Sequence, residues 1–162
     1  YSSSGAVPDV TNAYDIGSST LKYKDIYATT FYGTATEAYY ADLAENYIAD
    51  QDYEPGTVLA FGGEGEVEVT TIAVKGSRKV AGVVSTNPAY LMNSEADGVA
   101  LAISGRVPCK VTGAVAAGDL MVSAGNGMAM ANNDAKIGTV IGKAIEAHAG
   151  GEGVIEVLAL MM

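Results

Sequence analysis

The chain has 162 residues and a formal net charge of −10, with nine Lys and Arg residues against nineteen Asp and Glu residues. So few cations exclude nucleic acid as a partner, because neutralising phosphates requires clustered Lys and Arg. Hydrophobic residues make up 49% of the sequence, yet no apolar run approaches the roughly 20 residues of a membrane-spanning helix, so we expect no membrane insertion.

Composition changes sharply near residue 53. Nine of the ten tyrosines lie at or before Tyr53, whereas seventeen of the twenty glycines follow it. We therefore expect two parts, an extended oligomerisation or shaft segment over residues 1–53 and a glycine-rich β head domain over residues 54–162. The chain starts at Tyr1 rather than Met, which is compatible with a C-terminal piece of a longer protein.

The first part carries aromatic and β-branched residues at short intervals, such as Leu21, Tyr23 and Ile26. No run in it is long enough to form a sheet that closes on itself. A single chain therefore leaves this apolar surface uncovered, and we expect identical copies to intertwine and cover it.

Residues from about 35 to 49 predict a short helix. Thr34 and Glu37 have the spacing of a capping box, and four residues follow the 4, 3, 4 spacing of a coiled-coil seam. These proposed oligomerisation residues are Thr36, Tyr40, Leu43 and Tyr47. Six acidic residues and no basic residue occur from 37 to 54, which weakens an isolated helix and makes partners necessary. The alternative is one amphipathic helix lying on the following domain.

The second part predicts strands separated by turns. Residues 57–61 and 66–71 form the clearest hairpin, and residues 140–147 and 154–160 form another around the glycine turn at 150–153. Residues 79–85, 99–104 and 106–112 predict further strands, with Pro108 restricting the last to an edge or a bulge. Turn signals recur every 8 to 12 residues, about the spacing of a small all-β barrel or sandwich.

No constellation of side chains predicts catalysis. His148 is the single histidine and has no nucleophile elbow to accompany it. One Cys and one His cannot supply the ligands of a zinc site. The carboxylates from 37 to 54 do not surround a cleft, and Cys109 is expected to be a buried small hydrophobe. We expect no catalytic residue, no cofactor and no metal, with turn-forming side chains at 132–134 as a weak calcium alternative.

The longest polar interruptions of the β domain are the candidate receptor loops. On a rigid β scaffold, loops carry recognition. The candidates are Asn93, Ser94, Glu95 and Asp97 in one loop, and Asn126, Asn132, Asn133 and Asp134 in another.

The first part resembles a segment common in bacteriophage tail fibres. The residues that carry the resemblance are Asp15-Ile16-Gly17-Ser18-Ser19-Thr20, then Lys24-Asp25-Ile26-Tyr27, then Gly33-Thr34-Ala35. The second part is similar to the glycine-rich β domain near the ends of such fibres, through residues 117–123, 127–130, 138–144 and 153–158.

The resemblance implies a homotrimeric virion appendage, a tail fibre or adhesin tip, that joins other virion tail proteins. It would contact a glycan or protein on the host cell surface without catalysis. Two alternatives remain open. One is a connector or polymerising subunit of an extracellular filament, and the other is a fibre enzyme that cleaves surface glycans.

Overall fold

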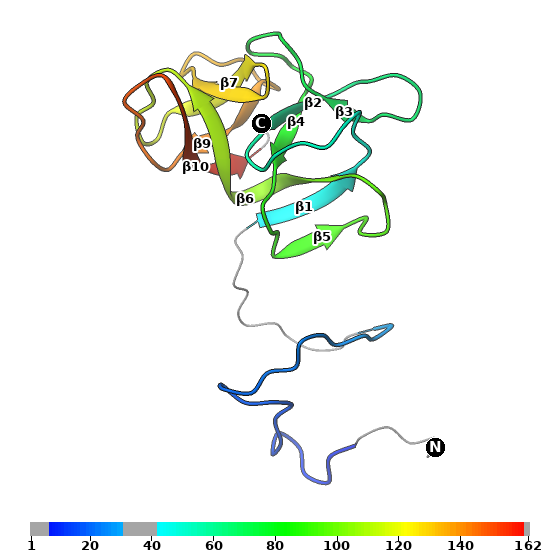
Figure 1. Cartoon of the computed structure of the whole chain (residues 1–162). Coiled ribbons are helices and arrows are strands. Elements are labelled where there is room, and N and C mark those ends of the chain that lie inside the picture. Colours follow the sequence, from blue (N-terminus) through cyan, green and yellow to red (C-terminus); the bar gives the residue numbers. More distant parts are fainter. Residues whose placement is uncertain (1–6, 31–41, 161–162) are drawn as a thin grey trace. The chain divides into compact units, whose positions relative to one another are not determined.

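The computed structural model describes residues 7–30 and 42–160. These residues contain ten β-strands and no helix, so none of the described segments is a helix able to cross a membrane. The chain divides into two compact units, Tyr1–Thr36 and Glu37–Met162 (Figure 1). The all-β prediction is confirmed for the second unit, and the two units are described in turn.

Five strands of the second unit close into a barrel. They are β6 (Val99–Thr112), β7 (Leu120–Gly125), β8 (Met128–Ala131), β9 (Val140–Ala144) and β10 (Glu152–Leu160). The order around the ring is β6–β8–β7–β9–β10, and β10 pairs with β6 to complete it. All neighbours are antiparallel except β6 and β8, which pair in parallel between Val111 and Ala129. Of the two architectures expected, the barrel is therefore the one that forms.

Alternate side chains of these strands fill the barrel, as the two-residue period of a strand requires. In β6 they are Val107, Cys109 and Val111, and in β10 they are Ile155, Val157 and Ala159. Met121 from β7 and Ile141 from β9 are fully buried between them. The residues between, such as Arg106 and Leu158, point outward and are exposed.

The other five strands extend the sheet from the N-terminal half of β6. On one side β4 (Val80–Val84) pairs with β6, β2 (Val58–Phe61) pairs with β4, and β3 (Val69–Thr70) pairs with β2. On the other side β1 (Asp42–Tyr47) pairs with β6 and with β5 (Tyr90–Met92). All of β4 is buried because Val80 and Val83 join the barrel core, whereas Ala81 and Val84 join a second cluster around Leu101.

One long strand, β6, replaces the two strands expected at 99–104 and 106–112. Gly105, with φ of 111°, lies where the pairing of β1 ends. Pro108 pairs with Glu156 of β10, and on its other side β6 has no strand partner between Gly105 and Val111. The Lys110 N–H donates to the Gly56 carbonyl oxygen and so points away from β10, and the nitrogen of Pro108, two residues earlier, points to the same side. The missing N–H of Pro108 therefore costs no hydrogen bond to β10.

Both predicted hairpins are present. β2 and β3 are antiparallel, with Phe61 opposite Val69. β9 and β10 are antiparallel, with Ala144 opposite Val157. In each case a glycine-containing turn joins residues of high β propensity, which is why the local pattern predicts the pairing.

The helix expected over residues 35–49 is wrong for the part of it that the structure describes. Residues 42–47 are strand β1, with side chains alternating between buried and half-buried. Backbone pairing with β5 on one edge and β6 on the other satisfies these residues, and tertiary pairing of this kind overrides local helix propensity. Thr36 and Tyr40, the first two residues of the proposed seam, lie outside the described residues.

The division between the units lies between Thr36 and Glu37, ahead of the boundary expected near residue 53. β1 belongs to the sheet of the second unit through its pairing with β6 from Asp42 to Tyr47. The change in tyrosine and glycine content therefore marks a position inside the β unit, after its first strand.

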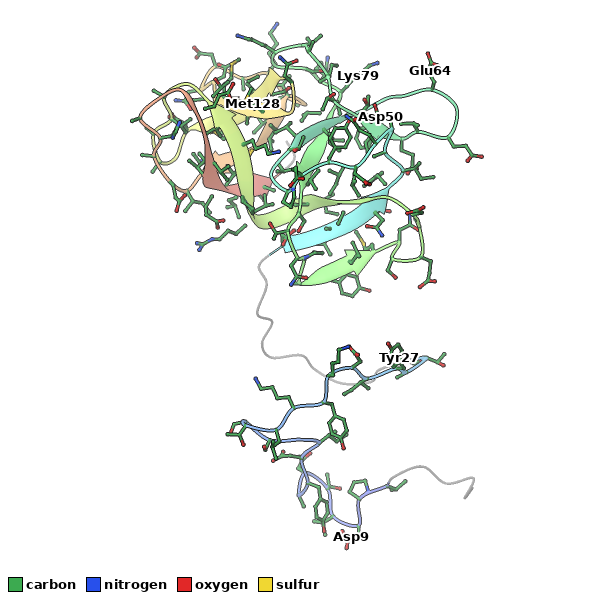
Figure 2. All side chains as sticks on the ribbon, in the orientation of Figure 1. Asp9, Tyr27, Asp50, Glu64, Lys79 and Met128 are labelled. Carbon is green, nitrogen blue, oxygen red and sulfur yellow. The ribbon has the colours of Figure 1, made fainter. Side chains whose placement is uncertain are left out.

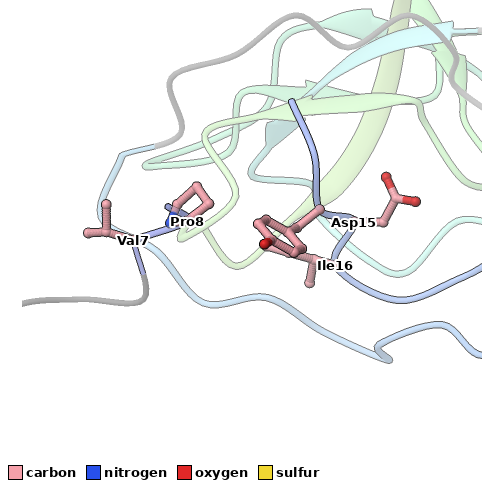
Figure 3. Close-up of a pocket in the computed structure, with 5 residues that line it drawn as sticks. Val7, Pro8, Asp15 and Ile16 are labelled. Atoms are coloured by element: carbon pink, nitrogen blue, oxygen red, sulfur yellow. The ribbon is translucent and has the colours of Figure 1, made fainter. Parts of the chain in front are cut away.

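Residues 7–30 form neither helix nor strand, and every one of them is exposed. A turn at Ser18 is closed by its N–H, which donates to the Leu21 carbonyl oxygen at 2.8 Å, and by the Leu21 N–H, which donates to Ser18 Oγ at 3.0 Å. The Tyr14 hydroxyl donates a hydrogen bond to Asp9 Oδ1 at 2.8 Å, and this hydrogen bond raises the pKa of Tyr14. Around it lies a hollow of about 350 Å³ lined by Val7, Pro8, Tyr14, Asp15 and Ile16 (Figure 3).

Candidate functional site

A polar cavity lies where the chain leaves β1 and where it enters β6. Its volume is about 430 Å³, and it is lined by Ile48, Ala49, Gln51, Asp52, Asp97, Gly98 and Val99. The polar side chains among these are one amide and two carboxylates, all exposed. Asp97 belongs to the first candidate receptor loop, so one predicted residue lies at this site.

The loop that carries Asp97 is fastened to β1 by asparagine side chains. Asn93 Nδ2 donates to the Asn46 carbonyl oxygen at 3.1 Å, and Asn46 Nδ2 donates to the Ala96 carbonyl oxygen at 3.2 Å. Asn93 has a φ of 53°, a left-handed conformation that Asn tolerates. Ser94, Glu95 and Asp97 remain exposed. The loop is thus held at its base while its polar side chains face solvent.

The opposite wall of the cavity is held by Asp50, which Figure 2 labels. Asp50 accepts a hydrogen bond from the Tyr53 hydroxyl at 2.7 Å and another from Thr70 Oγ1 at 2.8 Å. The hydrogen bond from Tyr53 is the main reason that the pKa of Asp50 is lowered. The Ile48 N–H also donates to Glu68 Oε2 at 2.9 Å. These contacts tie residues 48–52 to β3.

Gly98 brings the two walls together. A Cβ at this position would overlap the Tyr47 carbonyl oxygen at the end of β1. The close approach of the two backbones is therefore possible only with glycine here. This requirement is steric, since the φ of Gly98 is not in the left-handed region.

The side chains that line the cavity accept and donate hydrogen bonds, and they include no hydroxyl, thiol or imidazole group. Carboxylate and amide groups at an open concave surface suit a ligand rich in hydroxyl groups. Within residues 7–30 and 42–160, no group of three or more His, Cys, Asp and Glu side chains is placed to hold a metal ion. The geometry therefore favours recognition by hydrogen bonds.

The residues of the second candidate loop do not line this cavity. Asn133 Oδ1 accepts the Leu120 N–H at 2.9 Å, and Asn133 Nδ2 donates to Asp119 Oδ1 at 2.8 Å. Asn132 Oδ1 accepts the Asp134 N–H at 3.0 Å. The hydrogen bond from Asn133 is the main cause of the lowered pKa of Asp119. Asn132 and Asn133 are thus used by the turn itself, and together with Asp134 they stay predictions as receptor residues.

Asn126 lies at the tip of the β7–β8 hairpin, outside the cavity. Its φ is 50° and that of Gly127 is 75°, so both central residues of the turn have positive φ, as type I′ hairpins require. The Asn126 N–H donates to the Ile72 carbonyl oxygen at 3.1 Å. Its side chain is exposed, and it remains a prediction as a receptor residue.

The described members of the proposed oligomer seam lie on β1. Tyr47 packs against the second core cluster and meets Phe61 edge to face, with ring centroids 5.9 Å apart. Burial, followed by its hydrogen bond to Glu45 at 2.9 Å, raises the pKa of Tyr47. Leu43 pairs with Tyr90 on one edge and Ser104 on the other and is half-buried. Tyr47 is therefore a residue of the fold's own core, not of a helical seam.

The two residues considered for reactivity are both structural. Cys109 is fully buried in the barrel, and desolvation raises its pKa to about 12, so the thiolate required of a nucleophile is suppressed. The prediction that Cys109 is buried is confirmed. His148 exchanges two backbone hydrogen bonds with Val115, at 2.8 and 2.9 Å, in an isolated bridge between the barrel turns.

Sequence reasoning missed Gln51, Asp52 and Asn46 as parts of this site. Asn46 fell inside the expected helix and the other two at its exit, where a solvated face was expected. Comparison with models of protein families gives no match, and no curated protein matches the chain. The site is therefore interpreted from its own geometry.

Proposed function

We propose that this protein is a subunit of a homotrimeric virion appendage, a tail fibre or adhesin tip, which contacts the host cell surface without catalysis. In this proposal the first unit associates with identical copies and with other virion tail proteins. The second unit presents its polar cavity to a host surface glycan, or to a surface protein, outside the cell.

The observation that carries the proposal is the uncovered apolar surface of residues 7–30. Eight large apolar side chains in this short segment are 54–94% exposed: Val7, Val10, Tyr14, Ile16, Leu21, Tyr23, Ile26 and Tyr27. Burying one such side chain is worth about 1.5–3 kcal/mol. Association of identical copies gains free energy of this order for each of these side chains that it buries. The proposal of three copies, rather than another number, comes from the resemblance of residues 15–35 to tail-fibre segments.

The polar cavity supports the recognition half of the proposal. Its walls are fixed by hydrogen bonds at Asn46, Asn93 and Asp50, so a ligand would meet a preorganised surface. A trimer presents three such cavities, and multivalency raises the avidity of a weak single site.

The test combines mass and binding. Light scattering on the chain should give three times the mass of one chain at micromolar concentration, and a monomer mass would contradict the proposal. Labelled protein should bind a subset of bacterial strains, and Asp97→Asn should reduce that binding. Glu95→Gln is the matched control, because it removes the same charge from the same exposed loop but does not line the cavity.

One observation favours the glycan-cleaving alternative enough to test it. Asp52 and Asp97 both line the cavity, and glycosidases use a pair of carboxylates. Release of reducing sugar from purified host polysaccharide, abolished by Asp52→Asn or Asp97→Asn, would replace the non-catalytic proposal. Growth of filaments without cell binding would instead support a connector.

A further inference from the structure

Charge is distributed unevenly over the second unit. From Asp42 to Ile72 the sequence contains eight acidic residues and no Lys or Arg. The cations that follow include Lys75 and Arg78 in the loop between β3 and β4, and Lys136 in the loop between β8 and β9. In a chain with a net charge of −10, the cations of the second unit thus all follow its most acidic stretch in sequence.

The loop between β3 and β4, which carries Lys75 and Arg78, lies beside the loop between β8 and β9, which carries Lys136 and also Asp134. The Gly76 N–H donates to the Ser123 carbonyl oxygen of β7 at 2.7 Å, and the adjacent Val122 pairs with Val140 at the start of β9. Arg78 Nε lies 3.6 Å from the position that a Cβ on Gly138 would take. Both loops are therefore anchored at β7, and the Arg78 side chain lies against the turn that follows Lys136.

This surface, which we name the basic patch, also exposes large apolar side chains. It comprises Val74, Lys75, Arg78, Lys136 and Ile137. Val74 is 58% exposed and Ile137 is 87% exposed. None of its three cations forms an ion pair within the part of the chain that the structure describes. Apolar side chains among unpaired cations are the composition expected of a contact with an acidic protein surface.

The acidic region offers a surface of matching chemistry. The loop between β2 and β3 carries Glu64, Glu66 and Glu68, and the first of these is labelled on the projecting loop in Figure 2. Phe61 at its base is 47% exposed. The loop is compact, because the Gly62 N–H donates to the Glu68 carbonyl oxygen at 3.0 Å. Carboxylates beside an exposed aromatic ring complement cations beside exposed aliphatic groups.

We propose that the basic patch of one copy binds the loop of residues 62–68 of a neighbouring copy. Such a contact joins two different surfaces, so it is heterologous and closes into a ring when the rotation between copies allows. Opposite charges at the contact also reduce the repulsion between chains of the same net sign. The inference rests on the proposed homotrimer and identifies a contact within it.

The direct test is zero-length crosslinking of Lys to Glu side chains in the full chain. Equal amounts of ¹⁴N- and ¹⁵N-labelled protein are mixed, equilibrated and treated with a carbodiimide, and the crosslinked peptides are identified by mass. Mixed-isotope peptides joining Lys75 or Lys136 to Glu64 or Glu66 are expected. If these residues are linked only within one isotope, or not at all, in protein of trimeric mass, the contact is wrong while the proposed homotrimer stands. A monomeric mass would refute both.

Charge exchange supplies a second readout. Lys75→Glu with Lys136→Glu, or Glu64→Lys with Glu66→Lys, should weaken association about tenfold or more, since like charges then face each other. The fourfold variant that carries all these changes should recover wild-type association. Lys143→Glu, at an exposed cation on β9, is the control and should leave association unchanged. Association could be unchanged in both twofold variants while the Lys75→Glu, Lys136→Glu variant loses binding to dextran sulfate. That result would make the basic patch a site for anionic polymers and would overturn the proposal.

Discussion

Two isoleucines four residues apart in sequence differ in whether the fold buries them. Ile141 in β9 is 0% exposed and belongs to the barrel core, whereas Ile137 in the preceding loop is 87% exposed. The substitution Ile→Ala removes the same three carbon atoms at each site. The pair therefore compares the same truncation at a buried and at an exposed site.

For Ile141→Ala the lost transfer free energy is about 2.4 kcal/mol, at about 0.8 kcal/mol for each buried carbon. The cavity left in a closed barrel adds to this, because the surrounding strands are hydrogen-bonded on both sides and relax little. Measured core substitutions of this kind cost about 2–5 kcal/mol. We expect a loss of about 3–4 kcal/mol, which is a large fraction of the roughly 5–15 kcal/mol that stabilises a typical domain. Ile137→Ala should change the free energy of unfolding by less than about 0.5 kcal/mol.

The assay is urea unfolding followed by circular dichroism over a series of protein concentrations, because self-association shifts apparent stability and only the concentration-independent part reports on the fold of one chain. Calorimetry should show a fall in Tm of about 10 °C for Ile141→Ala. A loss below about 1 kcal/mol at Ile141 would refute the packing of the barrel described above. Ile137→Ala has its own expected effect, weaker association of copies without loss of fold, because it removes an apolar side chain from the basic patch.

Three further predictions concern the fold and its ionisable groups. A chain trimmed to residues 42–160 should keep its β-type circular dichroism and cooperative unfolding but lose trimeric mass; non-cooperative unfolding would show that the units share a core. Cys109→Ser should cost about 1–3 kcal/mol by burying a hydroxyl, and the native thiol should resist a thiol reagent; fast modification would contradict its burial. Folding lowers the pKa of Asp119. The stability that its carboxylate contributes is therefore present above the unfolded pKa of about 4 and is lost as the pH falls through the folded pKa. Asp119→Asn should flatten this acid-side loss, and an unchanged pH profile of stability would reject the role of its hydrogen bonds.

The parts of the fold predicted correctly are those encoded by neighbouring residues. Two runs of high β propensity on either side of a glycine turn specify the β9–β10 hairpin, because the turn and both strands lie within about twenty residues. Closure of the barrel depends on β10 pairing with β6, where Val157 lies opposite Val107. Nothing local in either strand identifies its distant partner. Sequence reasoning therefore predicts the class of the fold and not the order of its strands.

The failed helix has a specific cause. Leu43 and Tyr47 are four residues apart, a spacing that fits one face of a helix, but in β1 they also lie on one face of a strand, as positions i and i+4 do. Ala44 and Asn46, which lie between these two residues in sequence, distinguish a strand from a helix, because both are buried on the opposite face of β1. A buried Asn is not expected in a short amphipathic helix with a solvated face. Its burial becomes reasonable only when the loop carrying Asn93 and Ala96 supplies its partners.

The candidate site shows why the function of such a domain is harder to predict than its architecture. Gln51 and Asp52 approach Asp97 only because β1 and β6 are paired from Asp42 to Tyr47 and because Gly98 lets the Tyr47 carbonyl approach. Each side chain alone is an ordinary exposed polar residue. The cavity is a property of the pairing of two strands far apart in sequence. A substitution that separates those strands without touching a polar side chain, such as Gly98→Ala, should therefore impair cell binding as severely as removal of the Asp97 carboxylate.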